Sequence, residues 1–297
     1  MEELPENYRS GYVAIIGFPN AGKSTLLNAL LNIKLSIISK KPQTTRRRVL
    51  GILNRDTCQI VFVDTPGILK PRYALQKKMM EYVRSALSDA DLILLIVDAA
   101  AKHHPVDLDL KSMNPSGKPV ILLLNKIDII PKGEALPLIE TYTAFYPFET
   151  IIPISALQVD GIDRVEEEMI KRLPLGYPFY PPDVITDHPE RFFAAEFIRE
   201  KIFERFYQEI PYSTEVEIEI FEERKNRPDY IMATIYVERK SQKGMLIGKG
   251  GEAIKSIGTA ARKEIEEFLG RRVFLELRVK VNEDWRRSEI KLRRLGF

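Results

Sequence analysis

The feature that most constrains this chain is a phosphate-binding motif between a strand and a helix. Residues 12–16 form an apolar run, residues 17–25 read Gly-Phe-Pro-Asn-Ala-Gly-Lys-Ser-Thr, and the helix-forming stretch 26–31 follows. This is the pattern G-x-x-x-x-G-K-[ST] in the strand–loop–helix context that it requires. Glycines let backbone N–H groups converge on an anion, and the N-terminus of a helix favours negative charge. A chance glycine-rich turn is the alternative, but the context favours a nucleoside triphosphate site.

The nucleotide site is predicted to continue onto a second strand. Within the first motif, Lys23 is expected to reach the β- and γ-phosphates, and the Ser24 hydroxyl to bind Mg²⁺. The buried strand 60–63 ends in Asp64-Thr65-Pro66-Gly67, where Asp64 would hold Mg²⁺ through water and the Gly67 N–H would contact the γ-phosphate. The residues predicted to contact the nucleotide from these two segments are Asn20, Ala21, Gly22, Lys23, Ser24, Thr25, Asp64, Thr65, Pro66 and Gly67.

The base is predicted from a third strand. The apolar run 120–124 ends in Asn125-Lys126-Ile127-Asp128. A carboxylate at Asp128 can accept both the ring N–H and the exocyclic amine of guanine, a donor pair that adenine lacks. Asn125 and Lys126 are expected to bridge back to the phosphate loop and pack on the base. Backbone N–H groups of Ser155, Ala156 and Leu157 would close over it. These four motifs, in this order, predict a GTP site and resemble the translation-factor class of GTPases.

The hydrolytic residue is not evident from these motifs. Ile68 follows the DTPG motif, where Ras-like proteins have a glutamine that orients the attacking water. An apolar side chain cannot do this, so another group or the backbone must position the water. In related GTPases with an apolar residue there, an asparagine at the position of Asn20 helps to hold K⁺ beside the phosphates. By that resemblance Asn20 would hold K⁺; a loop-stabilising role is the alternative.

Composition indicates a chain of two domains that is not disordered. The chain has 297 residues, 44% of them hydrophobic and 29% charged, with a net charge of +3. Its single cysteine, Cys58, excludes a disulfide framework, and no apolar run approaches the ~20 residues that a membrane span needs. Strands and helices alternate up to residue 173, which predicts an α/β, doubly wound GTPase sheet. Five prolines then lie between residues 174 and 189. The predicted domains are 1–174, a proline-rich linker 175–190, and 191–297.

The last 107 residues read as a smaller α+β domain. Alternating strands are predicted at 214–220, 231–237 and 273–281, and helices at 192–206, 252–269 and 283–295. Between the second strand and the long helix lies Gly248-Lys249-Gly250-Gly251, a GxxG loop. The order helix–strand–strand–helix–helix–strand matches the type II KH arrangement, whose groove takes about four unpaired nucleotides. The residues predicted to bind RNA are Gly248, Lys249, Gly250 and Gly251, with Arg286 and Arg287 from a basic C-terminal helix.

These features together resemble the Era family of bacterial GTPases, which assemble the small ribosomal subunit. The resemblance covers essentially the whole chain. Its most specific marker is Pro42-Gln43-Thr44-Thr45-Arg46-Arg47-Arg48, which is similar to the family's switch I, where a threonine completes the Mg²⁺ shell. Thr45 is preferred and Thr44 is the alternative. The predicted catalytic residues are Lys23, Thr45 and Gly67, and the predicted Mg²⁺ ligands are Ser24, Thr45 and Asp64.

The resemblance implies GTP hydrolysis at a slow intrinsic rate. It implies 16S rRNA near its 3′ end and the 30S subunit as partners, GTP, GDP and Mg²⁺ as ligands, and a cytoplasmic, monomeric protein. Family members are also reported at the inner face of the plasma membrane, so the resemblance also implies peripheral association there. A signalling or cell-cycle GTPase with a C-terminal protein- or membrane-binding module is the alternative function. An RNA-modifying activity is disfavoured because no Cys, His or carboxylate cluster is left over to carry it.

Overall fold

The computed structural model describes residues 5–39, 41–101, 108–131 and 133–297. Backbone contacts divide the chain into two compact units. The first comprises Met1–Ser36, Thr45–Lys70 and Met79–Asp187, and the second comprises Ile37–Thr44, Pro71–Lys78 and His188–Phe297. The second unit therefore includes two short segments from within the sequence of the first.

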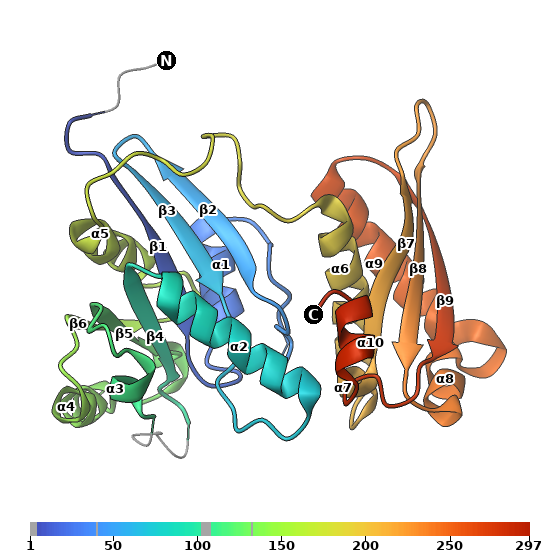
Figure 1. The fold of residues 1–297 in the computed structure, drawn as a ribbon, viewed down its shortest axis with the longest axis horizontal. Coiled ribbons are helices and arrows are strands. Elements are labelled where there is room, and N and C mark those ends of the chain that lie inside the picture. The colour runs from blue at the N-terminus through green and yellow to red at the C-terminus, as the bar shows by residue number, and fades with distance from the viewer. Residues whose placement is uncertain (1–4, 40, 102–107, 132) are drawn as a thin grey trace. The chain divides into compact units, whose positions relative to one another are not determined.

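The first unit is built on a six-stranded sheet in the order β2-β3-β1-β4-β5-β6 (Figure 1). The strands are β1 (Arg9–Ile16), β2 (Val49–Arg55), β3 (Cys58–Asp64), β4 (Leu92–Asp98), β5 (Val120–Asn125) and β6 (Thr150–Ile154). All neighbours are parallel except β2, which runs antiparallel to β3. β3 and β5 are buried along their whole length, as expected of strands covered on both faces. The predicted α/β GTPase sheet is confirmed, with one antiparallel edge strand.

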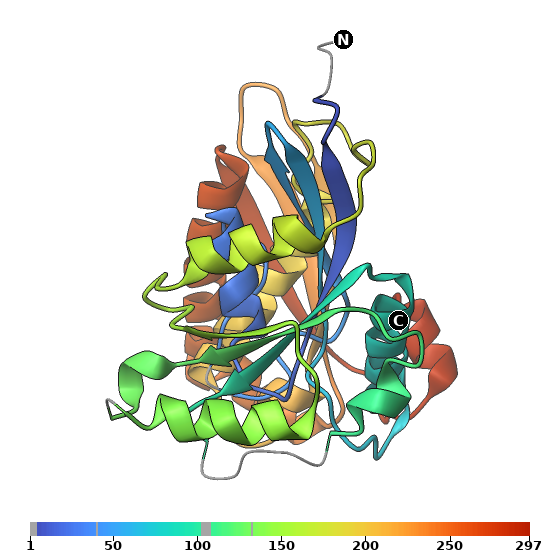
Figure 2. The ribbon, with the colours of Figure 1, turned by 90° about the vertical axis from the view of Figure 1, so that its left-hand side faces the viewer.

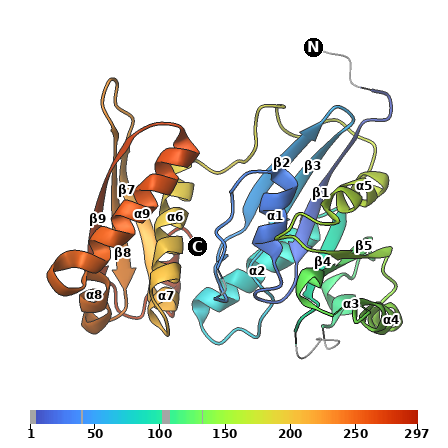
Figure 3. The ribbon, with the colours of Figure 1, turned by 180° about the vertical axis from the view of Figure 1, so that it is seen from behind.

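Helices cover both faces of this sheet (Figure 2). They are α1 (Lys23–Leu31), α2 (Ala74–Asp89), α3 (Leu110–Met113), α4 (Ala135–Phe145) and α5 (Ile162–Arg172). α1 and α5 contact each other on the face seen in Figure 3. The parallel strands β1, β3, β4 and β5 end at the same edge of the sheet, so the loops that follow them meet there. This is the edge at which the predicted nucleotide motifs converge.

The proline-rich segment packs along the first unit. The side chain of Gln59, which is fully buried, accepts hydrogen bonds from the N–H groups of Phe179 (2.7 Å) and Tyr180 (3.0 Å) and donates one to the Tyr180 carbonyl (2.8 Å). The Ile52 N–H, on edge strand β2, donates to the Ile185 carbonyl at 2.9 Å. The predicted linker 175–190 is thus tied to the sheet over much of its length, and residues up to Asp187 belong to the first unit.

The second unit contains a three-stranded sheet in the order β7-β8-β9, with α6 and α9 packed on one face (Figure 3). Its elements are α6 (Glu190–Arg205), α7 (Ile210–Ser213), β7 (Glu215–Glu222), β8 (Asp229–Val237), α8 (Lys240–Ile247), α9 (Glu252–Leu269), β9 (Val273–Val281) and α10 (Glu289–Arg294). β7 is antiparallel to β8, and β9 is parallel to it. The order of elements predicted for a type II KH domain is confirmed.

The C-terminal helix is shorter than the sequence predicted. The helix expected at 283–295 is α10, which begins only at Glu289. Asp284 has a left-handed φ of 52°, which interrupts a helix, and the buried indole of Trp285 donates to the Ser213 carbonyl at 2.9 Å. Ser288 then caps α10 by accepting from the Lys291 N–H. Tertiary anchoring of the tryptophan therefore keeps residues 283–288 out of the helix.

Candidate functional site: a guanine-nucleotide pocket and a KH groove

The loop between β1 and α1 has the backbone geometry of a phosphate cradle. Gly22, directly before α1, has a φ of 105°, and Asn20 is left-handed with a φ of 65°. A Cβ at Gly22 would lie 2.2 Å from the Nδ2 atom of Asn125, and one at Gly17 would lie 2.2 Å from the Ile96 carbonyl oxygen. Both glycines are therefore required by the packing of neighbouring segments. The N-terminus of α1, with no acidic residue in its first turn, faces this loop.

Four oxygen-bearing side chains meet beside the loop. Asp64 is fully buried, and its Oδ2 atom accepts hydrogen bonds from the hydroxyls of Ser24 (2.8 Å) and Ser36 (3.0 Å). The hydroxyls of Ser24 and Thr45 are 2.9 Å apart. Because Ser24 donates its proton to Asp64, Thr45 is the donor of that bond. The Oδ1 atom of Asp64 is buried without a hydrogen-bond partner. Hard oxygen ligands with one vacant buried carboxylate oxygen suit Mg²⁺.

Burial shifts the pKa values of Lys23 and Asp64, beside the loop, toward the neutral form of each group. Burial lowers the pKa of the Lys23 ammonium to about 8, although the Asp64 carboxylate opposes the shift. Burial also raises the pKa of Asp64, and Lys23 with the hydroxyls of Ser24 and Ser36 offsets part of that rise. The Lys23 Nζ atom donates to the carbonyls of Phe18 (2.9 Å) and Gly17 (3.2 Å). An anion at Lys23 and a cation at Asp64 would stabilise the charged form of each group.

Asn125 ties the predicted base site to the phosphate loop. Its Nδ2 atom donates to the Ala21 carbonyl at 2.8 Å, and its Oδ1 atom accepts from the Ala156 N–H at 2.9 Å. The expected bridge from Asn125 to the phosphate loop is therefore present. Lys126 instead pairs with Asp98, 2.5 Å from Nζ to Oδ2. Asp128 is exposed, as a side chain must be to receive a base.

Two predicted nucleotide contacts have other partners in this structure. The Ala156 N–H is engaged by Asn125, so it is not free to reach a base, whereas Leu157 is 71% exposed. The Thr65 hydroxyl donates to the Ile15 carbonyl at 2.8 Å and is fully buried. Gly67 packs closely under the loop, since a Cβ there would lie 2.7 Å from the Pro19 nitrogen. Thr65 thus fixes β3 to β1. Gly67 lies beside the phosphate loop, and its contact with the γ-phosphate stays a prediction.

The GxxG loop joins α8 to α9 in the second unit. Gly248, Gly250 and Gly251 have φ values of 74°, 61° and 82°, a region that side-chain-bearing residues rarely adopt. A Cβ at Gly250 or Gly251 would meet nothing within 4 Å, so the open space beside them is available to a ligand. Lys249 between them is exposed. The loop therefore offers bare backbone and one cation to an approaching phosphate.

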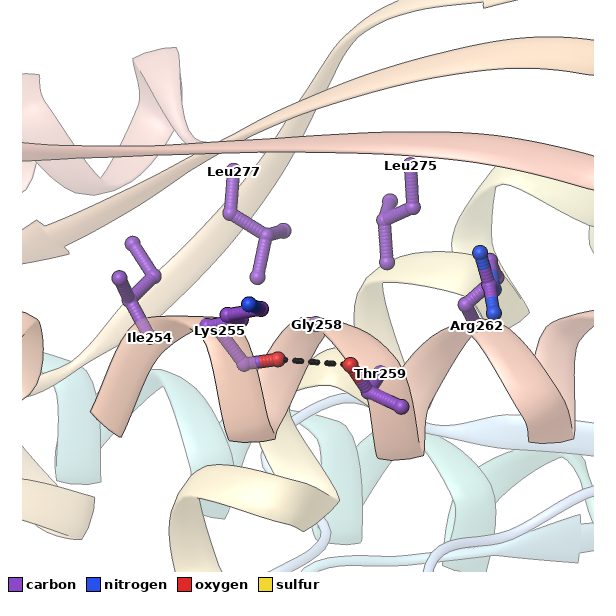
Figure 4. Close-up of a pocket in the computed structure, with 7 residues that line it drawn as sticks. All are labelled: Ile254, Lys255, Gly258, Thr259, Arg262, Leu275 and Leu277. Carbon is purple, nitrogen blue, oxygen red and sulfur yellow. Dashed lines mark hydrogen bonds between the residues drawn. The ribbon is translucent and has the colours of Figure 1, made fainter. Parts of the chain in front are cut away.

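A groove continues from this loop between α9 and β9 (Figure 4). It has a volume of ≈ 260 Å³. It is lined by Ile254, Lys255, Gly258, Thr259, Arg262, Leu275 and Leu277. Sequence reasoning placed the GxxG loop but missed these groove residues. The helical spacing of positions 254, 255, 258, 259 and 262 after the loop is the signal that marks them as one face of α9.

The two predicted C-terminal cations differ in their surroundings. Arg286 forms an ion pair with Glu238, and its side chain is 21% exposed. Its charge is therefore largely balanced within the second unit. Arg287 is exposed. Of the pair, Arg287 has the more accessible charge for a phosphate.

Among the residues that the structure describes, no helix is long and apolar enough to cross a bilayer. In the same part of the chain, no three His, Cys, Asp or Glu side chains gather in a way that would hold a metal ion. The Asp64 site is of a different kind, since its other oxygens come from hydroxyl groups.

Comparisons with known proteins agree with this geometry. Residues 12–126 match the family model described as 50S ribosome-binding GTPase, and residues 209–286 match that of the KH domain. GTPase Era of Geotalea uraniireducens is 47% identical over 98% of this chain and 99% of its own length. The chloroplastic GTPase ERA1 of Zea mays is 45% identical over 99% of this chain and 72% of its own length.

Two solved structures are similar over nearly the whole chain. One is Aquifex aeolicus Era, in a variant bound to GDP.AlF4-, and the other is Era in complex with MgGDPNP and nucleotides 1506–1542 of 16S ribosomal RNA. Each has a TM-score of 0.93 and 44% identity, covering 97% of this chain and 99% of the other. The fold and site define a P-loop GTPase with a C-terminal KH domain. Within that class, the chain belongs to the Era family, and it is a GTPase.

Proposed function

We propose that the chain binds GTP with Mg²⁺ and hydrolyses the GTP slowly. This cycle would control when the chain binds and releases the 3′ end of 16S rRNA during 30S assembly. The observation that most supports the proposal is the presence of both a guanine-nucleotide site and a KH groove in one chain. The relative bound to MgGDPNP and a 16S rRNA fragment supports the same pairing of ligands.

The residues of the first unit suit distinct roles in hydrolysis. Lys23 and the N–H groups at the start of α1 would bind the β- and γ-phosphates, and Asp128 would select guanine. Ser24 and Thr45 would bind Mg²⁺ directly and Asp64 through water. The metal would neutralise charge that develops on the phosphate oxygens. Water then attacks the γ-phosphorus while the bond to the β–γ bridging oxygen breaks, and the Gly67 N–H would orient the γ-phosphate.

The proximity of Thr45 to Ser24 supports Thr45 over Thr44 as the switch I ligand. The Thr45 hydroxyl lies 2.9 Å from that of Ser24. Because Ile68 cannot orient water, a K⁺ ion held by Asn20 would supply charge beside the phosphates. The left-handed backbone of Asn20 is compatible with either this role or loop stabilisation.

Salt-dependent RNA binding tests the proposed function. The full chain should bind single-stranded RNA from the 3′ end of small-subunit rRNA, with an affinity that falls steeply as salt rises, because phosphate contacts release counterions. Filter binding at several salt concentrations measures this, with a duplex of equal length as the control. A C-terminal module for protein partners would show no such affinity, which would favour the alternative of a signalling GTPase.

A ribosomal-RNA ligand would place the working protein in the cytoplasm. We expect the chain to act there as a monomer. Peripheral association with the inner membrane stays a prediction, and flotation with anionic liposomes would test it.

A further inference from the structure

Ser36 lies in the segment that follows α1 and contacts the buried carboxylate of Asp64. Its side chain is 2% exposed, and its hydroxyl donates to the Oδ2 atom of Asp64 at 3.0 Å. The segment around Ser36 is neither helix nor strand, so a side chain has to fix its backbone. A lone serine in a loop belongs to no motif, and Ser36 is therefore not among the residues predicted from the sequence.

Asn28 fixes the backbone of Ser36. Asn28 lies on α1 four residues after Ser24, so the two side chains share one face of the helix. Its Oδ1 atom accepts hydrogen bonds from the N–H groups of Leu35 (3.0 Å) and Ser36 (2.9 Å), and its Nδ2 atom donates to the Ser36 carbonyl at 2.8 Å. The amide thus pairs with both backbone groups of Ser36, as a neighbouring strand would. The position of the Ser36 hydroxyl is therefore set by α1, the helix that also carries Ser24.

Hydroxyl groups connect Ser36 and Thr45, which flank residues 37–44, to one carboxylate oxygen. Ser36 donates to the Oδ2 atom of Asp64 directly, and Thr45 is linked to the same atom through the hydroxyl of Ser24. The terminal torsion of an aspartate side chain is broad, so one donor alone leaves the carboxylate room to turn. Two donors from different segments hold Oδ2 on the hydroxyl side, and Oδ1 is the oxygen buried without a hydrogen-bond partner.

We propose that Ser36 is a positioning residue for Mg²⁺: it holds the Asp64 carboxylate in the orientation needed to bind the metal through water, and Asn28 acts through Ser36. The inference rests on the proposed metal site of Ser24, Thr45 and Asp64 and adds two residues that act on it indirectly. Hydrogen-bond partners of metal ligands orient those ligands, and their loss typically weakens metal binding about 10- to 100-fold.

The Mg²⁺ dependence of nucleotide binding by the full chain tests the role of Ser36. A fluorescent, non-hydrolysable GTP analogue is titrated at a series of free Mg²⁺ concentrations, and again with a chelator in place of Mg²⁺. Ser36→Ala should raise the Mg²⁺ concentration for half-maximal strengthening about 10- to 100-fold. The affinity without Mg²⁺ should equal that of the unmodified chain, because Ser36 acts only through a metal ligand. A merely structural role would weaken binding in both conditions.

Two further variants separate the hydroxyl from the space that it fills. Ser36→Cys keeps nearly the same volume but has only a weak donor, so it should shift the Mg²⁺ dependence in the same direction as Ser36→Ala. It also carries the test if Ser36→Ala does not fold. Ser10→Ala is the matched control, because Ser10 on β1 is likewise 2% exposed and its hydroxyl donates to the Tyr177 carbonyl at 2.6 Å. It should leave both affinities unchanged.

Asn28→Ala tests the step from Asn28 to Ser36. It should raise the Mg²⁺ requirement as Ser36→Ala does. The double variant should bind Mg²⁺ no more weakly than the weaker single variant, because both changes act through the same hydroxyl. Additive losses would show that Asn28 does not act through Ser36.

The outcomes separate this inference from the proposed metal site. If the unmodified chain bound the analogue equally well with and without Mg²⁺, the metal site itself would be overturned. If Mg²⁺ strengthened binding in the unmodified chain and equally in Ser36→Ala and Ser36→Cys, only the role of Ser36 would be overturned. A loss in those two variants that is the same with and without Mg²⁺ would also overturn it.

Discussion

At the scale of single residues, Asp64 and Asn125 illustrate two uses of a buried polar group. Asp64 keeps one oxygen unpartnered in the interior, an arrangement that is costly unless a ligand completes it. Asn125 has both ends of its amide occupied, by Ala21 and Ala156. The first residue is prepared for a ligand, and the second holds the loops that surround that ligand.

Asp128→Asn should exchange the base preference from guanine to xanthine. The carboxylate accepts two guanine donors, whereas an amide can donate to the 2-oxo group of xanthine. GTP affinity should fall at least about 100-fold, because buried guanine donors lose their acceptor. Competition between GTP and xanthosine triphosphate measures the change. A variant that still prefers GTP would disprove the role of Asp128.

Hydrolysis should depend on K⁺ if Asn20 holds that ion. Replacing K⁺ by Na⁺ at constant ionic strength should lower the rate of phosphate release, and Asn20→Ala should remove the difference between the two salts. Equal rates of the unmodified chain in both salts would instead leave Asn20 with the loop-stabilising role.

At the scale of elements, the loop between α8 and α9 and the segment along β2 are shaped by different constraints. The loop needs glycine because of its backbone φ values, and its surroundings are open. The proline-rich segment is held by hydrogen bonds to β2 and β3, among them those of Gln59 with both the N–H and the carbonyl of Tyr180. It also covers β2, an edge that would otherwise be exposed.

Lys249→Asp should weaken RNA binding for every sequence alike. The exposed ammonium meets phosphate, which carries no base information, so both affinity and the salt slope should decrease. Lys225→Asp, on the turn between β7 and β8, makes the same change of charge and is the control. Equal losses in the two variants would mean that only net charge matters. GTP affinity should stay unchanged in both.

Gln59→Ala should destabilise the first unit by about 2–4 kcal/mol. It removes four hydrogen bonds, three with the backbone of residues 179 and 180 and one that the Gln59 amide donates to the Asn54 Oδ1 atom at 2.7 Å. Denaturant unfolding measures the loss. Thr186→Val is the control, because it removes one other hydrogen bond of the same segment, which the Thr186 hydroxyl donates to the Leu50 carbonyl at 2.7 Å. A similar small loss in both variants would show that the segment contributes little to stability.

At the scale of the whole chain, two compact units carry two different ligands. Any effect of GTP on RNA affinity must be matched by an equal effect of RNA on GTP affinity, because the coupling free energy is shared. We expect a factor different from one.

Titrating each ligand in the presence and absence of the other measures that factor. The two experiments must agree, which makes each a check on the other. Lys23→Ala, which should lose GTP binding, is the control and should bind RNA as the nucleotide-free chain does. If neither ligand changed the affinity for the other, the KH domain would attach the chain to RNA without responding to the nucleotide.

By itself, the sequence determined the class of fold and the positions of the motifs. The phosphate loop, the DTPG and NKID motifs and the GxxG loop are short segments whose residue types and spacing act locally, so no distant contact is needed to read them. The alternation of apolar runs likewise predicted both sheets. Only the tertiary structure decided which other distant groups meet: Gln59 with Tyr180, Arg286 with Glu238, and the face of α9 with Leu277. Those pairings arise because the chain folds back on itself, and no local pattern records them.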